Sequence, residues 1–312
     1  MTLKDKSANK DQVKDYLIDL QNNIIGTVEL ADGSNFLHDS WQRKEGGGGT
    51  TCIMENGHVF ERAGVGFSHV VGSKLPKSAT DAHPEVANRK WEAMGVSLVF
   101  HPKNPFIPTI HANWRYFEMY NSKGEIVTSW FGGGQDLTPY YFFKEDVIHF
   151  HKNCKKVCDK YSPDFYTEFK ESCDNYFWNT HRNESRGVGG LFFDYLKETN
   201  DFSIKDRFNF VCEVGDNFLQ SYLPIVNARK NTPFSKDNRR WQEIRRGRYV
   251  EFNLVHDRGT LFGLKTNGRI ESILMSLPPK VQWKYNYIPI KGSKEAELLD
   301  ILSKPIDWLK FE

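Results

Sequence analysis

Residues 95–143 carry the most regular strand pattern of the chain and read GVSLVFHPKNPFIPTIHANWRYFEMYNSKGEIVTSWFGGGQDLTPYYFF. Val96–Phe100, Thr109–Tyr120 and Ile126–Phe131 have the alternating apolar and polar residues of half-buried strands. The residues at 121–125, NSKGE, have the composition of a hairpin turn. We therefore predict that these strands form the antiparallel centre of the fold.

One face of this predicted sheet is polar. Successive side chains of a strand point to opposite faces. One face of the first strand carries Ser97, Val99 and His101, and the matching face of the second carries Thr109, His111, Asn113 and Arg115. A half-exposed strand would also alternate in this way. However, the three glycines at 132–134 precede Asp136, and glycine lets the backbone approach a ligand closely. This pattern favours a pocket for an anionic ligand.

Four long segments of the chain resemble the oxygen-dependent coproporphyrinogen III oxidases. They read SLVFHPKNPFIPTIHANWRYF, WFGGGQDLTPYYFFKEDVIHFH, HRNESRGVGGLFFD and RRGRYVEFNLVHDRGTLFGL followed by GRIESILMSLPP. The resemblance extends from about Trp41 to Pro279. It implies oxidative decarboxylation of two propionates of coproporphyrinogen III to vinyl groups, giving protoporphyrinogen IX in heme biosynthesis. It also implies O2 as co-substrate, no organic cofactor, and a homodimer.

Composition narrows the remaining function classes. The 312 residues carry a formal net charge of +2, so a basic field typical of nucleic-acid-binding proteins is absent. The sequence has no apolar run long enough to span a bilayer, and its N-terminus has no signal-peptide pattern. We therefore expect a cytoplasmic protein without integral membrane association. Because neither a repeat nor a linker interrupts the chain, residues 1–312 are predicted to form a single domain.

Helical periodicity and turn residues place the other elements. Helices are predicted at Asp11–Ile25, Asp81–Met94, Glu145–Tyr161, Asp164–His181, Asp206–Arg229 and Lys294–Ser303. Strands are predicted within Thr50–Val71 around a turn at Asn56, and at Tyr249–Val255, Thr260–Leu264 and Ile270–Leu277. The glycine-rich residues Arg43–Thr51 are interpreted as a flexible loop. Together these elements predict an α+β fold in which helices flank both faces of a large, mainly antiparallel sheet.

The resemblance also assigns candidate site residues. It implies substrate binding by Ser97, Asn113, Arg115, Asn267, Gly268 and Arg269. A guanidinium can hold a propionate through two parallel hydrogen bonds, although Arg269 could also be a solvated turn residue. His111 is the candidate general acid, because imidazole titrates near neutral pH. Asp136 is the second candidate catalytic residue, since its carboxylate could accept hydrogen bonds from pyrrole N–H groups.

A metal site is a further hypothesis. The predicted elements direct four histidines inward, and these match histidines that recur in the family: His101, His111, His151 and His181. Neutral imidazole binds several divalent metals, for example Mn2+, but this spacing matches no short metal motif. A histidine on an apolar helix stripe is more often a buried core residue. The reaction does not itself require a metal, because an electron-rich pyrrole can donate electrons to O2.

The cysteines follow neither a disulfide framework nor an iron–sulfur motif. The chain has five cysteines, an odd number without disulfide-framework spacing, and we expect reduced thiols. Cys154 and Cys158 are followed by Tyr161 where an iron–sulfur enzyme would have a third cysteine.

Two alternative functions stay open. A metal-dependent hydrolase would need metal for all activity and would not depend on O2. A non-catalytic tetrapyrrole carrier would bind substrate without needing His111 or Asp136.

Overall fold

The computed structural model describes residues 8–73, 89–199, 201–265 and 268–311. Over these residues a seven-stranded antiparallel sheet has the order β1-β2-β3-β4-β5-β6-β9. The strands are β1 (Leu37–Gln42), β2 (Gly47–Glu55), β3 (Phe60–Gly72), β4 (Trp91–Pro102), β5 (Thr109–Tyr120), β6 (Ile126–Thr138) and β9 (Gly189–Leu196), with β7 (Trp178–Asn179) and β8 (Glu184–Ser185) forming a separate ribbon.

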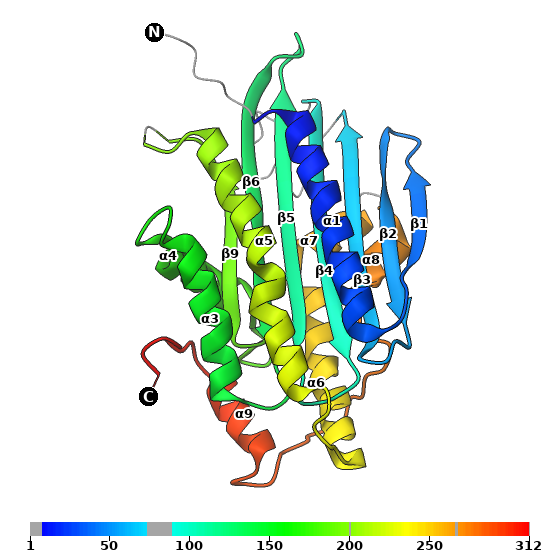
Figure 1. The fold of residues 1–312 in the computed structure, drawn as a ribbon, viewed down its shortest axis with the longest axis vertical. Coiled ribbons are helices and arrows are strands. Elements are labelled where there is room, and N and C mark those ends of the chain that lie inside the picture. Colours follow the sequence, from blue (N-terminus) through cyan, green and yellow to red (C-terminus); the bar gives the residue numbers. More distant parts are fainter. Residues whose placement is uncertain (1–7, 74–88, 200, 266–267, 312) are drawn as a thin grey trace.

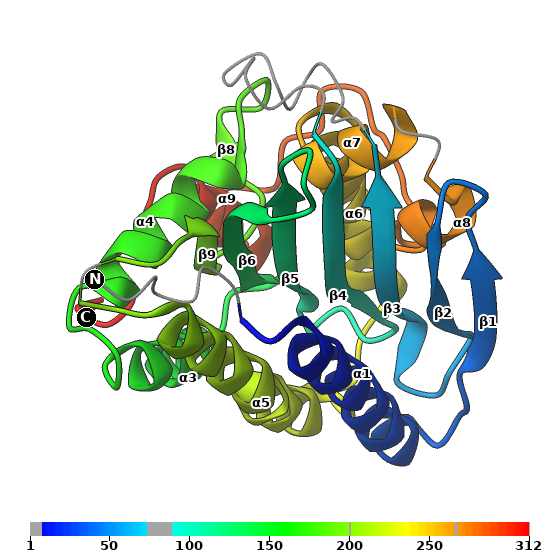
Figure 2. The ribbon, with the colours of Figure 1, turned by 90° about the horizontal axis from the view of Figure 1, so that it is seen from above.

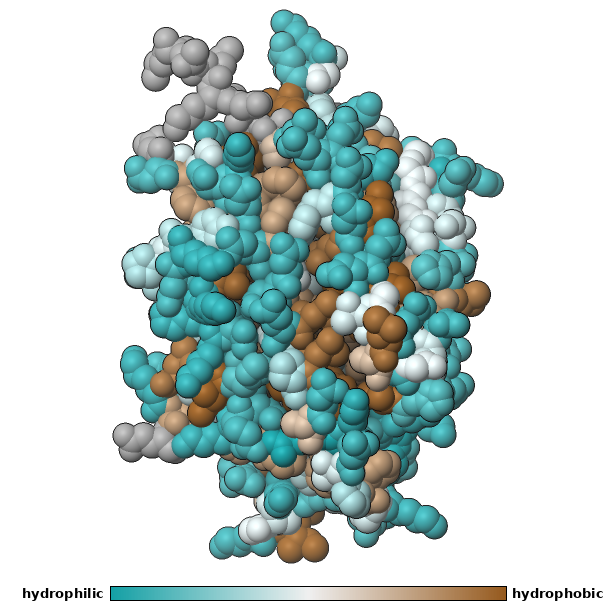
Figure 3. Space-filling model, in the orientation of Figure 1, coloured by the Kyte–Doolittle hydropathy of each residue, from teal (hydrophilic) through white to brown (hydrophobic). Residues whose placement is uncertain are grey.

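Helices cover both faces of the sheet, which confirms the predicted α+β architecture (Figure 1). They are α1 (Lys10–Asp32), α3 (Lys144–Cys158), α4 (Phe165–Tyr176), α5 (Ile204–Arg229), α6 (Lys236–Val255), α7 (Arg258–Lys265), α8 (Ile270–Leu274) and α9 (Lys294–Leu302). Figure 2 shows α1, α3 and α5 against one face and α6, α7 and α8 against the other. On the α1 side, most of the outer surface is hydrophilic (Figure 3).

The main core lies between the sheet and the layer of α1, α3 and α5. Helix α1 buries Val13, Leu17, Leu20 and Ile24, at the helical spacing predicted from the sequence. Alternate residues of the central strands face this layer, so Val96 and Trp114 are completely buried. The opposite faces of β4 and β5 are half-buried over much of their length. The sheet therefore has one closed face and one partly accessible face.

The predicted central strands are confirmed: β5 has the predicted bounds, and β4 and β6 are longer than expected. The turn between β5 and β6 is fixed by Asn121, whose side-chain oxygen accepts hydrogen bonds from the backbone of Lys123 and Glu125. β6 continues through the three glycines at 132–134 to Thr138. These glycines therefore lie inside a strand that extends beyond its predicted end at Phe131.

The strands predicted between Arg248 and Leu277 are wrong, because α6, α7 and α8 occupy this region. Helix α6 begins with a capping box in which Ser235 and Asn238 bind each other's backbone N–H groups. Its buried positions recur every three or four residues and include Trp241, Arg245, Tyr249 and Phe252. The short alternation after Tyr249 is part of this helical period.

The structure also differs from three other predictions. Trp91–Met94 belongs to β4 and not to a helix, and residues 81–88 lie outside the described part of the chain. The glycine-rich loop is largely strand β2, where a Cβ on Gly49 would lie only 2.2 Å from the Phe67 carbonyl oxygen. Helix α4 ends at Tyr176, so His181 lies beyond it. The helices predicted at α1, α3, α5 and α9 are confirmed.

Candidate functional site

The candidate site is built on the accessible face of β4, β5 and β6. Residues directly opposite one another in antiparallel strands share a face. The register therefore places three rows of side chains across this face: Val99, His111 and Asp136; Ser97, Asn113 and Gly134; Gly95, Arg115 and Gly132. An imidazole, an amide and a guanidinium thus follow one another along the middle strand. The sequence predicted this shared face.

His111 is oriented by a buried chain of polar contacts. Its Nδ1 atom lies 2.8 Å from Oδ1 of Asp136, and Arg186 donates a 2.7 Å hydrogen bond to the other carboxylate oxygen. Asp136 and Arg186 are almost completely buried, and Arg186 also donates to Asn253. Burial alone would raise the pKa of Asp136, but the charge of Arg186 and the contact with His111 lower it. The ionised carboxylate holds the Nδ1 proton of His111 and leaves Nε2 for a ligand.

The far row forms a cationic end. Arg115 donates a 3.0 Å hydrogen bond to Asn113, and its Nη2 atom lies 3.0 Å from Oδ1 of Asp194 on β9. Arg258, at the start of α7, has Nη2 3.6 Å from the other oxygen of Asp194 and lies over the Tyr176 ring. Two guanidinium groups from different elements therefore flank one carboxylate. This arrangement can receive the carboxylate of an anionic ligand.

Asp257 brings a second carboxylate to the site from the junction of α6 and α7. It accepts hydrogen bonds from the Thr260 backbone N–H at 2.7 Å and from the Tyr176 hydroxyl at 2.8 Å. Burial would raise the pKa of Asp257, but the Thr260 hydrogen bond and the nearby His111 lower it. In the sequence, Asp257 lies between the strands that were predicted at Tyr249–Val255 and Thr260–Leu264. Its spacing from Thr260, typical of a helix N-cap, was the available signal.

The remaining predicted substrate-binding residues lie apart from Arg115. Arg269 pairs with Asp39 on β1 and donates a 3.1 Å hydrogen bond to Ser272, whereas Arg115 lies on β5. The backbone N–H of Gly268 donates to the Gly263 carbonyl, which closes the end of α7. Asn267 is outside the described residues. The structure thus brings Ser97, Asn113 and Arg115 together but holds Arg269 near another edge of the sheet.

The four candidate metal-binding histidines do not form one group. His151 lies on α3, against the opposite sheet face, where its ring contacts the Tyr166 hydroxyl and the Val188 carbonyl, both at 3.0 Å. His181 is exposed and contacts His256 and Glu251, each at 2.9 Å. In the parts of the chain that the structure describes, no three His, Cys, Asp or Glu side chains are arranged to hold a metal ion. The described residues therefore do not bring the four histidines together around one ion.

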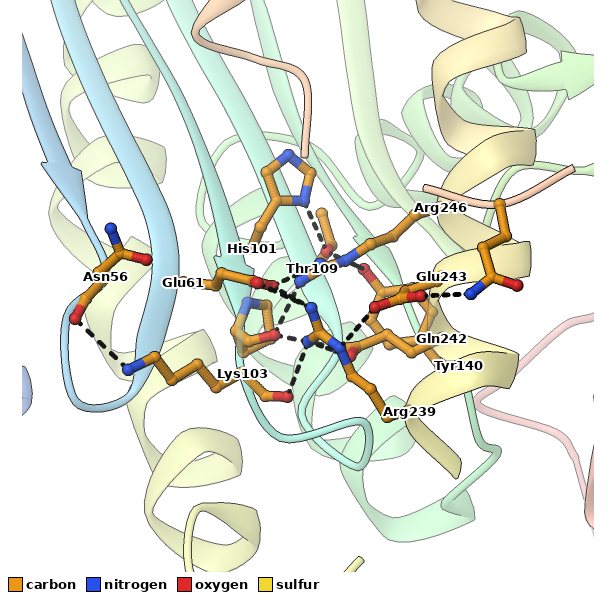
Figure 4. Close-up of polar contacts among 12 residues, drawn as sticks. Asn56, Glu61, His101, Lys103, Thr109, Tyr140, Arg239, Gln242, Glu243 and Arg246 are labelled. Carbon is orange, nitrogen blue, oxygen red and sulfur yellow. Dashed lines mark hydrogen bonds and ion pairs between the residues drawn. The ribbon is translucent and has the colours of Figure 1, made fainter. Parts of the chain in front are cut away.

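His101 belongs to a buried polar cluster that attaches α6 to the sheet (Figure 4). Its Nε2–H donates to the Ser276 carbonyl at 2.9 Å, so Nδ1 accepts from the Thr109 hydroxyl at 3.2 Å. Burial and the charge of Arg246 lower the pKa of His101 well below its usual value. The ring is therefore neutral, and both its nitrogens have protein partners. These contacts favour a structural role.

A protein-family model described as coproporphyrinogen III oxidase matches residues 12–308 of the chain. The chain belongs to the coproporphyrinogen III oxidase family. The match includes every element of the sheet, the site face and α6 to α9. Membership of this family supports a role in heme biosynthesis and implies coproporphyrinogen oxidase activity on coproporphyrinogen III.

Other features of this coproporphyrinogen oxidase family member concern its thiols and its helices. Cys52, Cys154, Cys158, Cys173 and Cys212 are free, as predicted from their odd number. Burial raises the pKa of the Cys154 thiol to about 12, which leaves it protonated and unreactive. Among the described helices, none has the length and apolar character needed to cross a membrane.

Proposed function

We propose that this protein catalyses the oxygen-dependent oxidative decarboxylation of two propionates of coproporphyrinogen III to vinyl groups, giving protoporphyrinogen IX. The observation that carries the proposal is the combination, on one accessible sheet face, of an oriented imidazole and a pair of guanidinium groups. A substrate with several carboxylates needs such cations. Oxygen chemistry on an electron-rich ring needs a positioned proton donor.

Substrate binding would use Arg115 and Arg258 for a propionate, with Ser97 and Asn113 as polar neighbours. Arg269, Gly268 and Asn267 stay predicted substrate contacts at the other end of the sheet. Asp257 is half-buried and could accept pyrrole N–H groups, because a carboxylate has more acceptor positions than its two present partners use. Asp136 has both oxygens engaged and is buried, so its proposed task is to orient His111.

The chemistry needs an electron acceptor and a proton donor. Each propionate loses CO2, a proton from its β carbon and two electrons as its side chain becomes a vinyl group. O2 accepts the two electrons and, with two protons, becomes H2O2. His111, as an imidazolium held by Asp136, would donate a proton from Nε2 to the reduced oxygen. The pyrrole supplies the electrons, so no organic cofactor is required. These steps assign binding to the arginines and proton transfer to His111.

A second copy of the chain is the proposed partner. Apolar side chains are exposed over α6 to α8 and the segment that follows: Leu254, Val255, Leu264, Ile270, Trp283 and Tyr285. Exposed apolar residues on successive elements favour a protein interface, and a homodimer would cover them. Sedimentation should give twice the chain mass. A monomer at micromolar concentration would contradict the homodimer. The cytoplasm is the proposed location.

The direct test is turnover of coproporphyrinogen III with and without O2, and with and without a chelator. We expect protoporphyrinogen IX only in the presence of O2. Activity that survives complete metal removal would contradict an essential divalent ion, including Mn2+. Loss of activity that a single divalent ion restores would establish a metal requirement. Binding without turnover would instead identify a carrier, and oxygen-independent hydrolysis would identify a hydrolase.

A further inference from the structure

Strand β9 departs from regular pairing beside the cationic end of the site. Residues 131–133 of β6 pair with residues 193–196 of β9, and the register shifts between them. Asp194 and Tyr195 together therefore lie opposite the single residue Gly132. Two residues opposite one make a β-bulge, a feature that redirects side chains and is frequent next to active sites.

The backbone of this bulge is unusual and is held by its surroundings. Tyr195 has φ +52°, a left-handed conformation that is uncommon for a residue with a side chain. Its ring packs against Trp130 with the ring centres 5.1 Å apart, and the Lys197 ammonium group lies 5.5 Å from the centre of the Trp130 ring. Such a conformation persists only where neighbouring contacts impose it. The contacts around Tyr195 therefore stabilise the bulge in β9.

The consequence of the bulge is the position of the Asp194 carboxylate. Oδ1 accepts a hydrogen bond from the Tyr195 backbone N–H and lies 3.0 Å from Nη2 of Arg115, whereas Oδ2 lies 3.6 Å from Arg258. Gly132, on the opposing strand β6, has no side chain and so leaves room for the contact between Asp194 and Arg115. A Cβ there would lie 2.7 Å from Nε of Arg115 and 2.9 Å from Oδ1 of Asp194.

We propose that Asp194, presented by this bulge, is a positioning residue that sets Arg115 and Arg258 to bind one substrate carboxylate. The assignment rests on the proposed function, because it names how that site receives a propionate. Two guanidinium groups that approach one ligand repel each other, and a fixed carboxylate between them offsets this repulsion. The three groups together carry a net charge of +1, which one ligand carboxylate neutralises.

The geometry favours positioning and not blocking. A guanidinium has five N–H donors. Of those on Arg115, Asn113 engages one and Asp194 lies against another, so three can still face a ligand. These are enough for a bidentate contact with a carboxylate. Arg258 has 59% of its side chain exposed and also keeps free donors. Asp194 therefore orients Arg115 and Arg258 and still leaves hydrogen-bond donors of both for a ligand.

The first experiment compares Asp194→Asn with the wild type and with Arg115→Ala in steady-state kinetics on coproporphyrinogen III. For Asp194→Asn we expect KM to rise about tenfold with kcat within about twofold, because binding is lost and the proton donor is untouched. Asp194→Glu, which restores the charge, should recover part of the loss. Asp159→Asn removes a surface carboxylate paired with Lys155 and is the matched control. An unchanged or lower KM for Asp194→Asn would overturn the proposal.

Gly132→Ala tests the same contact without removing a charge. Its methyl group would displace the Arg115–Asp194 pair, so the variant should raise KM as Asp194→Asn does. A substrate-free measurement separates this inference from the proposed function. Phenylglyoxal modification of Arg115 and Arg258, followed by peptide mass spectrometry, should be several-fold faster in both variants than in the wild type. Equal modification rates would refute the hold of Asp194 on the arginines, whether or not the wild type consumes coproporphyrinogen.

Discussion

His111 and His151 show how surroundings assign opposite roles to the same side chain. His151 is completely buried, and burial lowers its pKa to about 3. It is therefore neutral at physiological pH and donates Nε2–H to a backbone carbonyl. His111 is partly exposed on the site face, with a carboxylate behind it. The first ring is part of the core, and the second can exchange a proton with a ligand.

These surroundings predict a separation between activity and stability. His111→Ala should abolish turnover and leave the thermal midpoint nearly unchanged. His151→Ala should destabilise the protein by about 2–5 kcal/mol, because it leaves a cavity and removes two hydrogen bonds. Its activity should fall only as the folded fraction falls. Thermal unfolding and initial rates on the same samples check both expectations. Turnover retained in His111→Ala would contradict the proton-donor role.

Asp136 serves both the reaction and the fold, because its carboxylate contacts His111 and the buried Arg186. Asp136→Asn should reduce turnover at least about 100-fold, since the imidazolium loses its partner. It should also destabilise the fold by about 3–5 kcal/mol, because Arg186 is left as a buried, unpaired charge. His151→Ala is the control for a general loss of stability. Wild-type kinetics in Asp136→Asn would remove Asp136 from the mechanism.

Among the elements, α6 depends on the polar cluster of Figure 4. Glu61 of β3 pairs with Arg239 and with the completely buried Arg246, and Arg246 also donates to the Pro102 carbonyl. A buried charge without its partner costs much more than a neutral side chain of similar size. The pairing therefore fixes where α6 lies, and with it Asp257 and Asn253, the hydrogen-bond partner of Arg186.

A double-mutant comparison tests this role. Glu61→Gln should destabilise the protein by about 3–5 kcal/mol, because Arg246 loses its partner. Adding Arg246→Met should restore part of the loss, since the unpaired charge is then absent. Denaturant unfolding of the two single variants and the double variant gives the coupling energy. Additive losses would show that the pair does not act as a unit.

The same cluster explains why α6 was not predicted from the sequence. The buried side of α6 carries Gln242, Arg245, Arg246 and Asn253, so polar residues obscure its amphipathic pattern. The central strands β4 and β5 were predictable because their buried side is apolar. Arg186 was missed for a related reason. It is 50 positions from Asp136, and only the fold reveals a contact between residues that far apart in sequence.

At the scale of the whole molecule, acid should weaken the fold through Glu92. Hydrogen bonds from His69, Lys10 and Tyr120 lower its pKa to about 2, although burial opposes them. A lowered carboxylate pKa contributes stability above the unfolded value of 4.5, and this contribution is lost as pH falls from 4.5 towards 2. The contribution is at most about 3–4 kcal/mol, at about 1.4 kcal/mol per pKa unit.

Urea unfolding at pH 5.5 and pH 3 measures this effect. The wild type should lose more stability between these values than Glu92→Gln, which has no carboxylate to protonate at this position. Glu171→Gln, an exposed change on α4, should behave like the wild type. Parallel losses in the wild type and Glu92→Gln would place the acid sensitivity elsewhere.

The two arginines of the cationic end, Arg115 and Arg258, lie on backbone segments that differ in local stability. Arg115 lies on a strand with hydrogen-bonded neighbours on both sides, whereas Arg258 begins an eight-residue helix at the margin of the sheet. Amide hydrogens of central strands exchange with solvent slowly, and those of short peripheral helices exchange fast. Substrate should therefore slow deuterium uptake in α7 while leaving β5 nearly unchanged. Such a pattern would mean that the backbone of Arg115 is already ordered before substrate binds, whereas the backbone of Arg258 becomes more ordered when substrate binds.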